Sequence, residues 1–204
     1  MSTPSDSAPT ADEALQRLKA GNERFVAGTA RFSTVQNEIL ADLAKGQSPY
    51  ATILSCSDSR VPPELIFDAG LGELFIIRVA GNVVSPEIAG SLQYAGRHLR
   101  TPLFVVLGHT KCGAVAAAID ARLHGTRQHS RIQLLVDSIL PGLADLDLQL
   151  SPEAMSAQAV EANVRWSMRQ ILETPEGRER LAEGSIKLVG AIYEIETGRV
   201  RFLE

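Results

Sequence analysis

Two short segments of the sequence carry the residue types that metal-assisted chemistry needs. They are Cys56-Ser57-Asp58-Ser59-Arg60 and Gly108-His109-Thr110-Lys111-Cys112-Gly113. Zinc takes thiolate, imidazole and carboxylate ligands in tetrahedral sites, and two cysteines with one histidine leave one further position. Cys56, His109 and Cys112 are therefore candidate metal ligands, and Asp58 can offer an oxygen.

Three uses are open for Cys56 and Cys112, which are the two cysteines of the chain. They can form one disulfide, serve as two inert buried thiols, or bind a metal. The first residues lack the basic and apolar regions of a signal peptide, so we expect a cytoplasmic protein, in which structural disulfides are rare. Inert thiols would need both cysteines to fall beside His109 and Asp58 by coincidence. The pattern favours the metal site.

The elements that must position these residues alternate between strands and helices. Strands are expected at 50–55, 74–79, 103–107, 186–195 and 200–203. Helices are expected at 85–99, 111–124, 131–140 and 153–173. This alternation predicts an α/β fold with a mainly parallel β-sheet flanked by helices.

The order of these elements also predicts where the two segments meet. Ligands of such sheets bind beyond the carboxyl ends of the strands. The two segments follow the strands expected at 50–55 and 103–107. If these strands are neighbours, about 4.8 Å apart, the candidate ligands come together in space.

The N-terminal part precedes the first strand and has a different character. Thr10 and Glu13 form a capping-box pattern at the start of a helix expected at 11–26, and a second helix is expected at 35–45. We interpret residues 10–46 as an N-terminal helical arm and residues 1–9, rich in Ser, Pro and Thr, as a disordered tail. The 204 residues are expected to form a single domain.

The composition excludes several function classes. The chain is 45% hydrophobic and 22% charged, which is typical of a globular protein rather than a disordered one. Its net charge of −4 argues against a nucleic-acid partner bound through a basic face and against docking on anionic lipid. No apolar run approaches the roughly 20 residues of a membrane span, so no membrane partner is expected.

The two segments resemble the signatures of the β-class carbonic anhydrases, C-x-D-x-R after one strand and H-x-x-C-G after a later one. The similarity, which is to the plant-like branch of bacterial type, runs from about Leu15 to Val200. It includes Gly46-Gln47-Ser48-Pro49, Gly72-Glu73-Leu74-Phe75 and Ser91-Leu92-Gln93-Tyr94-Ala95.

The resemblance implies an enzyme, a carbonic anhydrase of the zinc lyases, with one Zn²⁺ per subunit held by Cys56, His109 and Cys112. Asp58 would either take the fourth position or turn away to pair with Arg60 and leave the metal open for water. The reaction implied is the reversible hydration of carbon dioxide to bicarbonate and a proton. Zinc-bound hydroxide would attack the substrate, oriented by the Asp58–Arg60 pair.

The family also implies a substrate pocket completed by a second subunit. Gln47, Phe75 and Tyr94 would reach in from the partner, and the backbone N–H of Gly113 would stabilise charge on a substrate oxygen. The N-terminal arm would embrace that partner. The protein is therefore expected to be a homodimer or a higher homo-oligomer such as a tetramer, with carbon dioxide and bicarbonate as its small-molecule ligands.

Two positions depart from the family pattern. One branch has a Trp three residues before the first zinc cysteine, where it forms a noncatalytic bicarbonate trap; here that residue is Ile53. We therefore predict that the trap is absent and that Asp58 stays paired to Arg60, away from the metal. Val79 stands where many relatives have Asn, which leaves the oligomer geometry open.

Three other functions compete with this interpretation. A hydrolase of carbonyl sulfide or carbon disulfide could use the same scaffold, because these linear molecules resemble carbon dioxide. A non-catalytic zinc-stabilised interaction module is a second, but it would need no Arg60 to draw Asp58 away. A thiol redox protein is a third, but the two cysteines lack the C-x-x-C spacing of such enzymes.

Overall fold

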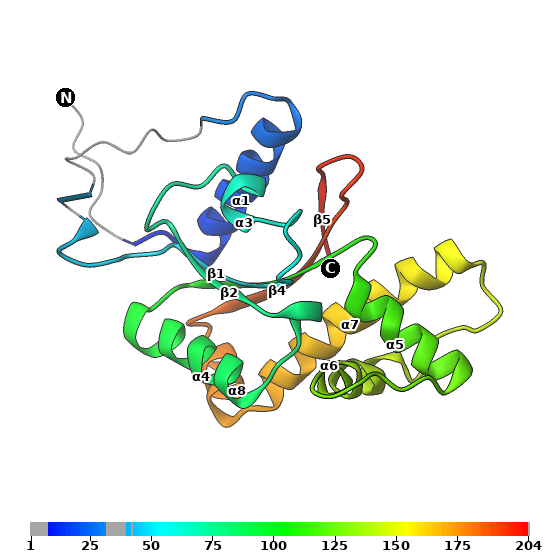
Figure 1. The fold of residues 1–204 in the computed structure, drawn as a ribbon. Coiled ribbons are helices and arrows are strands. Elements are labelled where there is room, and N and C mark those ends of the chain that lie inside the picture. Colours follow the sequence, from blue (N-terminus) through cyan, green and yellow to red (C-terminus); the bar gives the residue numbers. More distant parts are fainter. Residues whose placement is uncertain (1–7, 32–39, 42, 204) are drawn as a thin grey trace.

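A twisted sheet lies at the centre of the computed structural model, which describes residues 8–31, 40–41 and 43–203 (Figure 1). Within these residues it has five strands in the order β2-β1-β3-β4-β5. They are β1 (Ala51–Ser55), β2 (Leu74–Arg78), β3 (Leu103–His109), β4 (Lys187–Tyr193) and β5 (Val200–Phe202). The first four pair in parallel, and β5 joins β4 antiparallel at one edge. The predicted, mainly parallel α/β fold is confirmed.

The two strands that precede the metal-site segments are neighbours, as predicted. β1 and β3 pair in parallel with Ser55 opposite Leu107, so their carboxyl ends lie at the same edge of the sheet. Every residue of both strands is buried. Such central strands need apolar residues on both faces, which is why they are short runs without polar alternation.

Helices cover both faces of the sheet (Figure 1). One face is covered by α1 (Ala11–Val26) and the short α3 (Pro63–Ile66). The other face is covered by α4 (Pro86–Tyr94), α5 (Gly113–His124), α6 (Ile132–Ile139), α7 (Pro152–Glu173) and α8 (Pro175–Ala182). Shorter helical turns are η1 (Ala80–Asn82), η2 (Ala95–Leu99) and η3 (Leu140–Leu143). The sheet therefore has a separate hydrophobic core on each side.

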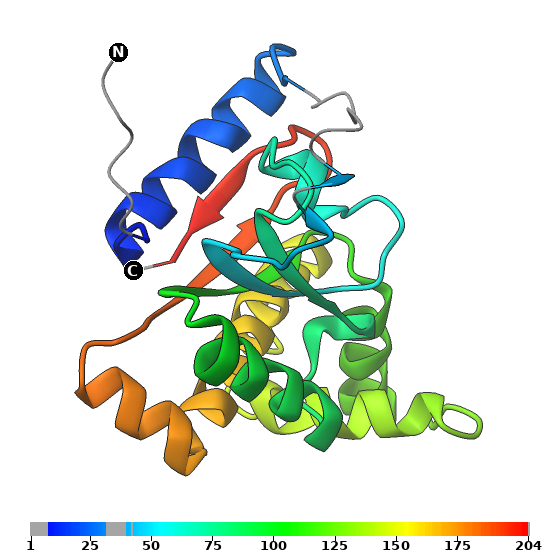
Figure 2. The ribbon, with the colours of Figure 1, turned by 90° about the vertical axis from the view of Figure 1, so that its left-hand side faces the viewer.

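Helix α1 packs on the sheet of its own chain, beside β5 (Figure 2). The predicted capping box is present, since Thr10 and Glu13 hydrogen-bond reciprocally. Leu18 is fully buried, and Asn22 donates to the carbonyls of Ile66 and Gly198 at 3.2 and 2.8 Å. The helix expected at 35–45 lies mostly outside the described residues, as does most of the expected tail at 1–9. Whether this arm contacts a second subunit stays a prediction.

Several predicted boundaries were wrong. β3 continues to His109 rather than ending at 107, and the helix expected from 111 begins at Gly113, because Lys111 has a left-handed φ of 58° that a helix does not accept. β4 ends at Tyr193, two residues early. Helices α3 and α8 were not predicted, because α3 has only 4 residues and the sequence of α8 shows no apolar period.

No helix within the described part of the chain has the length and apolar character needed to cross a bilayer.

Candidate metal centre

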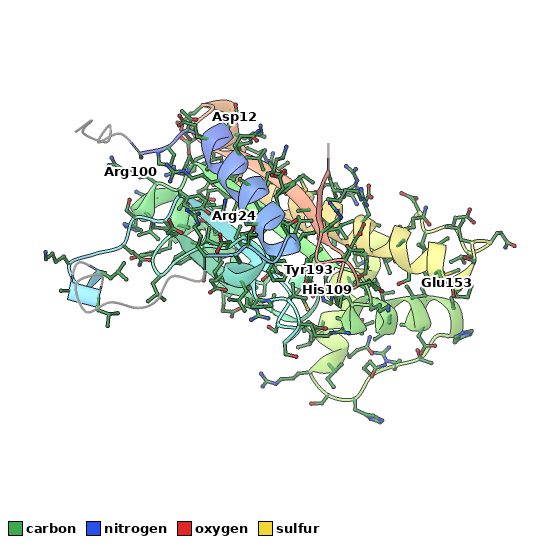
Figure 3. All side chains as sticks on the ribbon, turned by 90° about the horizontal axis from the view of Figure 1, so that it is seen from above. Asp12, Arg24, Arg100, His109, Glu153 and Tyr193 are labelled. Atoms are coloured by element: carbon green, nitrogen blue, oxygen red, sulfur yellow. The ribbon has the colours of Figure 1, made fainter. Side chains whose placement is uncertain are left out.

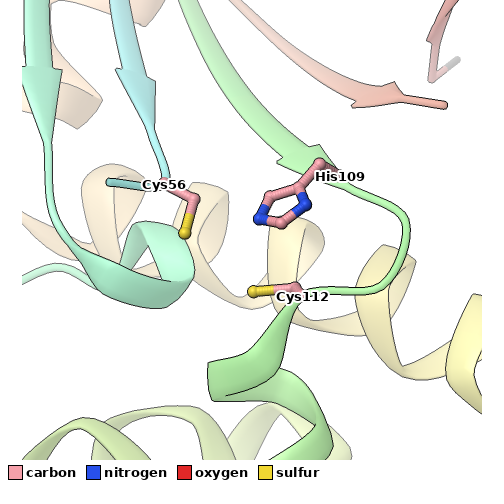
Figure 4. A group of neighbouring side chains, drawn as sticks. All are labelled: Cys56, His109 and Cys112. Atoms are coloured by element: carbon pink, nitrogen blue, oxygen red, sulfur yellow. The ribbon is translucent and has the colours of Figure 1, made fainter. Parts of the chain in front are cut away.

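Three potential ligands meet at the carboxyl edge of the sheet. Cys56 follows β1 directly, His109 is the last residue of β3, and Cys112 caps the N-terminus of α5. One ligand atom from each residue lies within 4.8 Å of the others, and all three side chains are buried. Figure 4 shows the two sulfurs and the imidazole converging from these three elements. The structure thus brings together the three residues that the sequence pattern predicted as candidate metal ligands.

The imidazole of His109 is oriented as a metal ligand would be. Its Nδ1 lies 2.9 Å from the carbonyl of Thr110, so this nitrogen carries the proton and donates it. Its Nε2 then has a free lone pair, and this fully buried atom has no hydrogen-bond partner among the described residues. An unpaired buried acceptor costs about 1–3 kcal/mol. Coordination of a cation such as zinc by Nε2 would remove this cost.

The thiols of Cys56 and Cys112 are hydrogen-bonded to each other, and each shifts the pKa of the other. A hydrogen bond with Cys112, helped by one from the Gly81 N–H, holds the pKa of Cys56 well below its usual value. The same hydrogen bond raises the pKa of Cys112, and burial adds to that shift. The pair therefore keeps one proton between two sulfurs. A divalent cation would displace that proton and neutralise both thiolates, so this donor set fits zinc.

Asp58 is turned toward Arg60 beside this cluster. Arg60 Nε and Nη2 donate to the two carboxylate oxygens at 2.9 and 2.7 Å. These hydrogen bonds hold the pKa of Asp58 well below its usual range. The nearer oxygen, Oδ2, still lies 4.0 Å from His109 Nε2. Asp58 is thus an ionised acceptor at the edge of the candidate site.

Arg78 supports the first segment, a contact that the sequence analysis did not assign. It ends β2, the neighbour of β1, and its Nε donates to the carbonyl of Cys56 at 3.0 Å. Its Nη2 donates to the carbonyl of Asp58 at 2.6 Å. In the sequence, Arg78 could be placed at the carboxyl end of a strand. That position predicts a contact with Cys56 only once β2 is known to be the neighbour of β1.

The turn between β4 and β5 supports the second segment. Thr110 accepts a hydrogen bond from the N–H of Ile195 at 3.0 Å and donates to Glu196 at 3.1 Å. Lys111 forms an ion pair with Glu196 and is the main cause that lowers the pKa of this carboxyl to about 2. Figure 3 shows His109 beside Tyr193, the last residue of β4. No sequence signal marked Glu196 for this contact.

The residues predicted to bind substrate do not all gather at this cluster. Gly113 begins α5 directly after Cys112, as expected, and a Cβ built on it would meet nothing within 4 Å. Phe75 and Tyr94 face each other with ring centroids 6.1 Å apart, and Gln47 is exposed before β1. Among the described residues, the hydrogen bonds of Cys56, Asp58 and His109 involve none of these last three.

The two departures from the family pattern lie on the sheet and beside it. Ile53 is fully buried in the core under α1. Val79 is partly buried directly after β2, and its N–H donates to the carbonyl of Ser55 at 3.1 Å. Neither side chain belongs to the metal cluster.

Comparison with known proteins places these features in one family. A family model described as carbonic anhydrase matches residues 51–200. Carbonic anhydrase 2 of Mycobacterium tuberculosis is 39% identical over 188 residues, which cover 91% of this chain and 89% of that protein.

Solved structures agree with the sequence relatives. The β-carbonic anhydrase CafA of Aspergillus fumigatus superposes with a TM-score of 0.75 at 29% identity, covering 95% of this chain and 90% of that one. A tetrameric β-carbonic anhydrase of Sordaria macrospora gives a TM-score of 0.74 at 25% identity, covering 94% and 97% of the two chains.

Proposed function

Because this chain belongs to the β-class carbonic anhydrases, we propose that it hydrates carbon dioxide reversibly to bicarbonate and a proton, using one zinc ion per subunit. The observation that carries the proposal is the buried Cys56, His109 and Cys112 cluster with the ionised Asp58 held beside it. Cytoplasmic location belongs to the same proposal.

Cys56, His109 and Cys112 would hold the zinc. When bound, zinc supplies a water made acidic enough to lose a proton near neutral pH. The two thiolates balance the double positive charge of the metal. They also donate more electron density than imidazoles would, so the surrounding hydrogen bonds must favour the deprotonated nucleophile.

The role of Asp58 is to orient the attacking water. Arg60 occupies both of its carboxylate oxygens and keeps it away from the fourth metal position. A carboxylate with a depressed pKa cannot donate a proton at neutral pH, so it can only accept a hydrogen bond from the nucleophile. That fixes the direction of the nucleophile's lone pair toward the substrate.

The backbone N–H of Gly113 would stabilise the negative charge that develops as bicarbonate forms. Its backbone N–H stands in the first turn of α5, where N–H groups lack intrahelical partners and the helix dipole favours negative charge. An oxygen that gains charge as bicarbonate forms would accept a hydrogen bond there.

The remaining pocket residues are proposed to come from a second copy of the chain. Gln47 would donate a hydrogen bond to the substrate, and Phe75 with Tyr94 would form an apolar wall for carbon dioxide. Gln47 and Tyr94 are exposed on their own chain, which supports this arrangement, as does the tetrameric state named for the Sordaria macrospora relative.

Stopped-flow assays on the purified protein test the proposal. We expect rapid hydration of carbon dioxide, measured with a pH indicator, and little hydrolysis of carbonyl sulfide or carbon disulfide. Preferential hydrolysis of either sulfur compound would replace the proposed substrate on the same site. Turnover of none of the three by the zinc-loaded protein would contradict the proposal.

A further inference from the structure

The turn η1 reaches the metal cluster from a different element than the ligands themselves. The N–H of Gly81 donates to Sγ of Cys56 at 3.3 Å. A donor on a thiolate stabilises its negative charge and fixes the direction of its lone pairs. The position of Gly81 therefore bears on how Cys56 presents its sulfur to a metal.

This turn has a backbone that needs external support. Gly81 and Asn82 both have left-handed φ values, 71° and 45°. The left-handed φ of Gly81 favours glycine, and an added Cβ would also crowd Cδ1 of Ile139 at 2.8 Å and Cβ of Ala114 at 3.0 Å. Two successive residues in this region are unfavourable unless neighbouring groups hold them.

Helix α7 supplies that support through two buried polar residues. Asn163 Nδ2 donates to the carbonyl of Gly81 at 2.8 Å, and Ser167 Oγ donates to the carbonyl of Asn82 at 2.9 Å. Asn82 Nδ2 approaches Ser167 Oγ at 3.4 Å in return. Asn163 is 1% exposed and Ser167 is fully buried. They stand one turn apart, on the same face of the helix.

Asn163 is an unfavourable residue for stability alone. Its Oδ1 is buried without a hydrogen-bond partner among the described residues, and its neighbour Val164 is fully buried in the core. A buried amide oxygen that has no hydrogen-bond partner carries a desolvation cost. The hydrogen bond that Asn163 does make goes to the carbonyl of Gly81, and it fixes the residue whose N–H donates to Cys56.

We propose that Asn163, assisted by Ser167, is a positioning residue of the metal centre, acting through Gly81 on the sulfur of Cys56. The inference rests on the proposed function only in taking Cys56 as a zinc ligand. It assigns to two residues of α7, which are distant in sequence from the ligands, a part in holding a site whose ligands come from the ends of β1 and β3 and the start of α5.

The test measures metal retention rather than turnover. Zinc-loaded wild type, Asn163→Ala and Ser167→Ala proteins are each mixed with a chromophoric chelator, and the rate of zinc transfer is recorded. Loss of a residue that orients a metal ligand typically weakens metal binding 10- to 100-fold. We expect zinc to leave Asn163→Ala about tenfold faster than wild type, and to leave Ser167→Ala about threefold faster.

A spectroscopic readout and a matched control separate positioning from stability. In cobalt-substituted protein, the thiolate-to-cobalt absorption band should shift in Asn163→Ala, because the donor to Cys56 is displaced. Gln170 lies on the same helix and also has an unpartnered side-chain oxygen among the described residues. Gln170→Ala should leave both the band and the zinc transfer rate as in wild type, whatever it does to the melting temperature.

The outcomes distinguish this inference from the proposed function. If Asn163→Ala and Ser167→Ala fold and match wild type in zinc transfer and in the cobalt band, the inference is overturned. If Asn163→Ala does not fold, Ser167→Ala decides by the same two measurements. A wild type that binds zinc but does not hydrate carbon dioxide would contradict the proposed function and leave the positioning role intact.

Discussion

The orientation of Asp58 decides what kind of metal site the Cys56, His109 and Cys112 cluster would form. Held by Arg60, it leaves the cluster with three protein ligands, which is the arrangement of catalytic zinc sites. Turned toward the metal, it would be the fourth ligand of a closed site. Residue 53 is Ile rather than Trp, which favours the arrangement with three protein ligands. The hydrogen bonds between Asp58 and Arg60 support the same arrangement.

Asp58→Asn tests this orientation. We expect the variant to keep its zinc, because Asp58 is paired with Arg60 and turned away from the cluster. We expect it to lose about 100-fold in kcat/KM for carbon dioxide hydration, because the amide no longer holds the nucleophile in the same way. Metal analysis and stopped-flow kinetics on the same preparation measure both. A large loss of zinc would show that Asp58 is a ligand.

The residues of the candidate metal cluster were predictable from the sequence, but the residues that support them were not. Cysteine and histidine types, placed after two strands, were enough to predict the Cys56, His109 and Cys112 cluster. Arg78, Glu196 and Asn163 act through contacts with residues far away in the sequence. Arginine, glutamate and asparagine are common residues, and nothing local separates these three from others of their type.

Helix α7 packs so closely on β3 that a side chain larger than that of Gly108 does not fit between them. A Cβ on Gly108 would lie 2.5 Å from Cγ2 of Val164, a stiff β-branched side chain that is fully buried. Glycine at this position lets the helix approach the strand that carries His109. The packing of α7 therefore supports the metal edge of the sheet in two ways, through this contact and through Asn163.

Gly108→Ala should lower the free energy of unfolding by about 2 kcal/mol, because the added methyl group overpacks this contact. Gly90→Ala is the matched control, since Gly90 lies in α4 and a Cβ there would meet nothing within 4 Å. It should be neutral or stabilise by about 0.5–1 kcal/mol. Urea unfolding measures both, and equal effects of the two changes would argue against the close approach.

The end of α1 is joined to the end of α3 by a buried carboxylate. The side chain of Asp68 is 2% exposed and accepts from Arg24 Nε at 2.5 Å and from the backbone N–H of Arg31 at 2.7 Å. Burial alone would raise its pKa, but these hydrogen bonds outweigh it, so the pKa is lowered overall. The ionised form therefore stabilises the fold.

Asp68→Asn should cost about 2 kcal/mol at neutral pH, because the neutral amide has no negative charge to pair with Arg24 and Arg31. A lowered pKa in the folded state means that this stability is fully present above the unfolded value of about 3.9 and is lost as the pH falls through the folded value. The gap between wild type and variant in urea unfolding should stay constant from pH 8 to pH 5 and narrow below pH 4. A gap that widens in acid would refute this assignment.

The alternation of strands and helices predicted most of the elements, because apolar periodicity decides them locally. It missed α3 and α8, which begin at Pro63 and Pro175 and are set by turn chemistry rather than by period. It also ended β3 too early. Gly108 and His109 read as loop residues, but pairing with Ile192 and Tyr193 of β4 extends the strand.

For the whole molecule, the main expectation beyond one chain is a second copy. Tyr94 is 46% exposed and packs against Phe75, as expected of residues that complete a neighbour's pocket. We expect light scattering after gel filtration to give at least twice the mass of one chain. Tyr94→Ala should lower kcat/KM without loss of zinc. An active monomer would contradict the shared pocket.

Zinc-dependent hydration of carbon dioxide is tested by following one preparation through removal and return of the metal. Carbon dioxide hydration is measured by stopped flow on the purified protein, again after zinc is removed by a chelator, and again after one zinc per chain is added. We expect activity to be lost on removal and restored at one equivalent, and Cys56→Ala to be inactive throughout. Full activity in the metal-free protein, or no activity with one zinc bound per chain, would contradict zinc-dependent hydration.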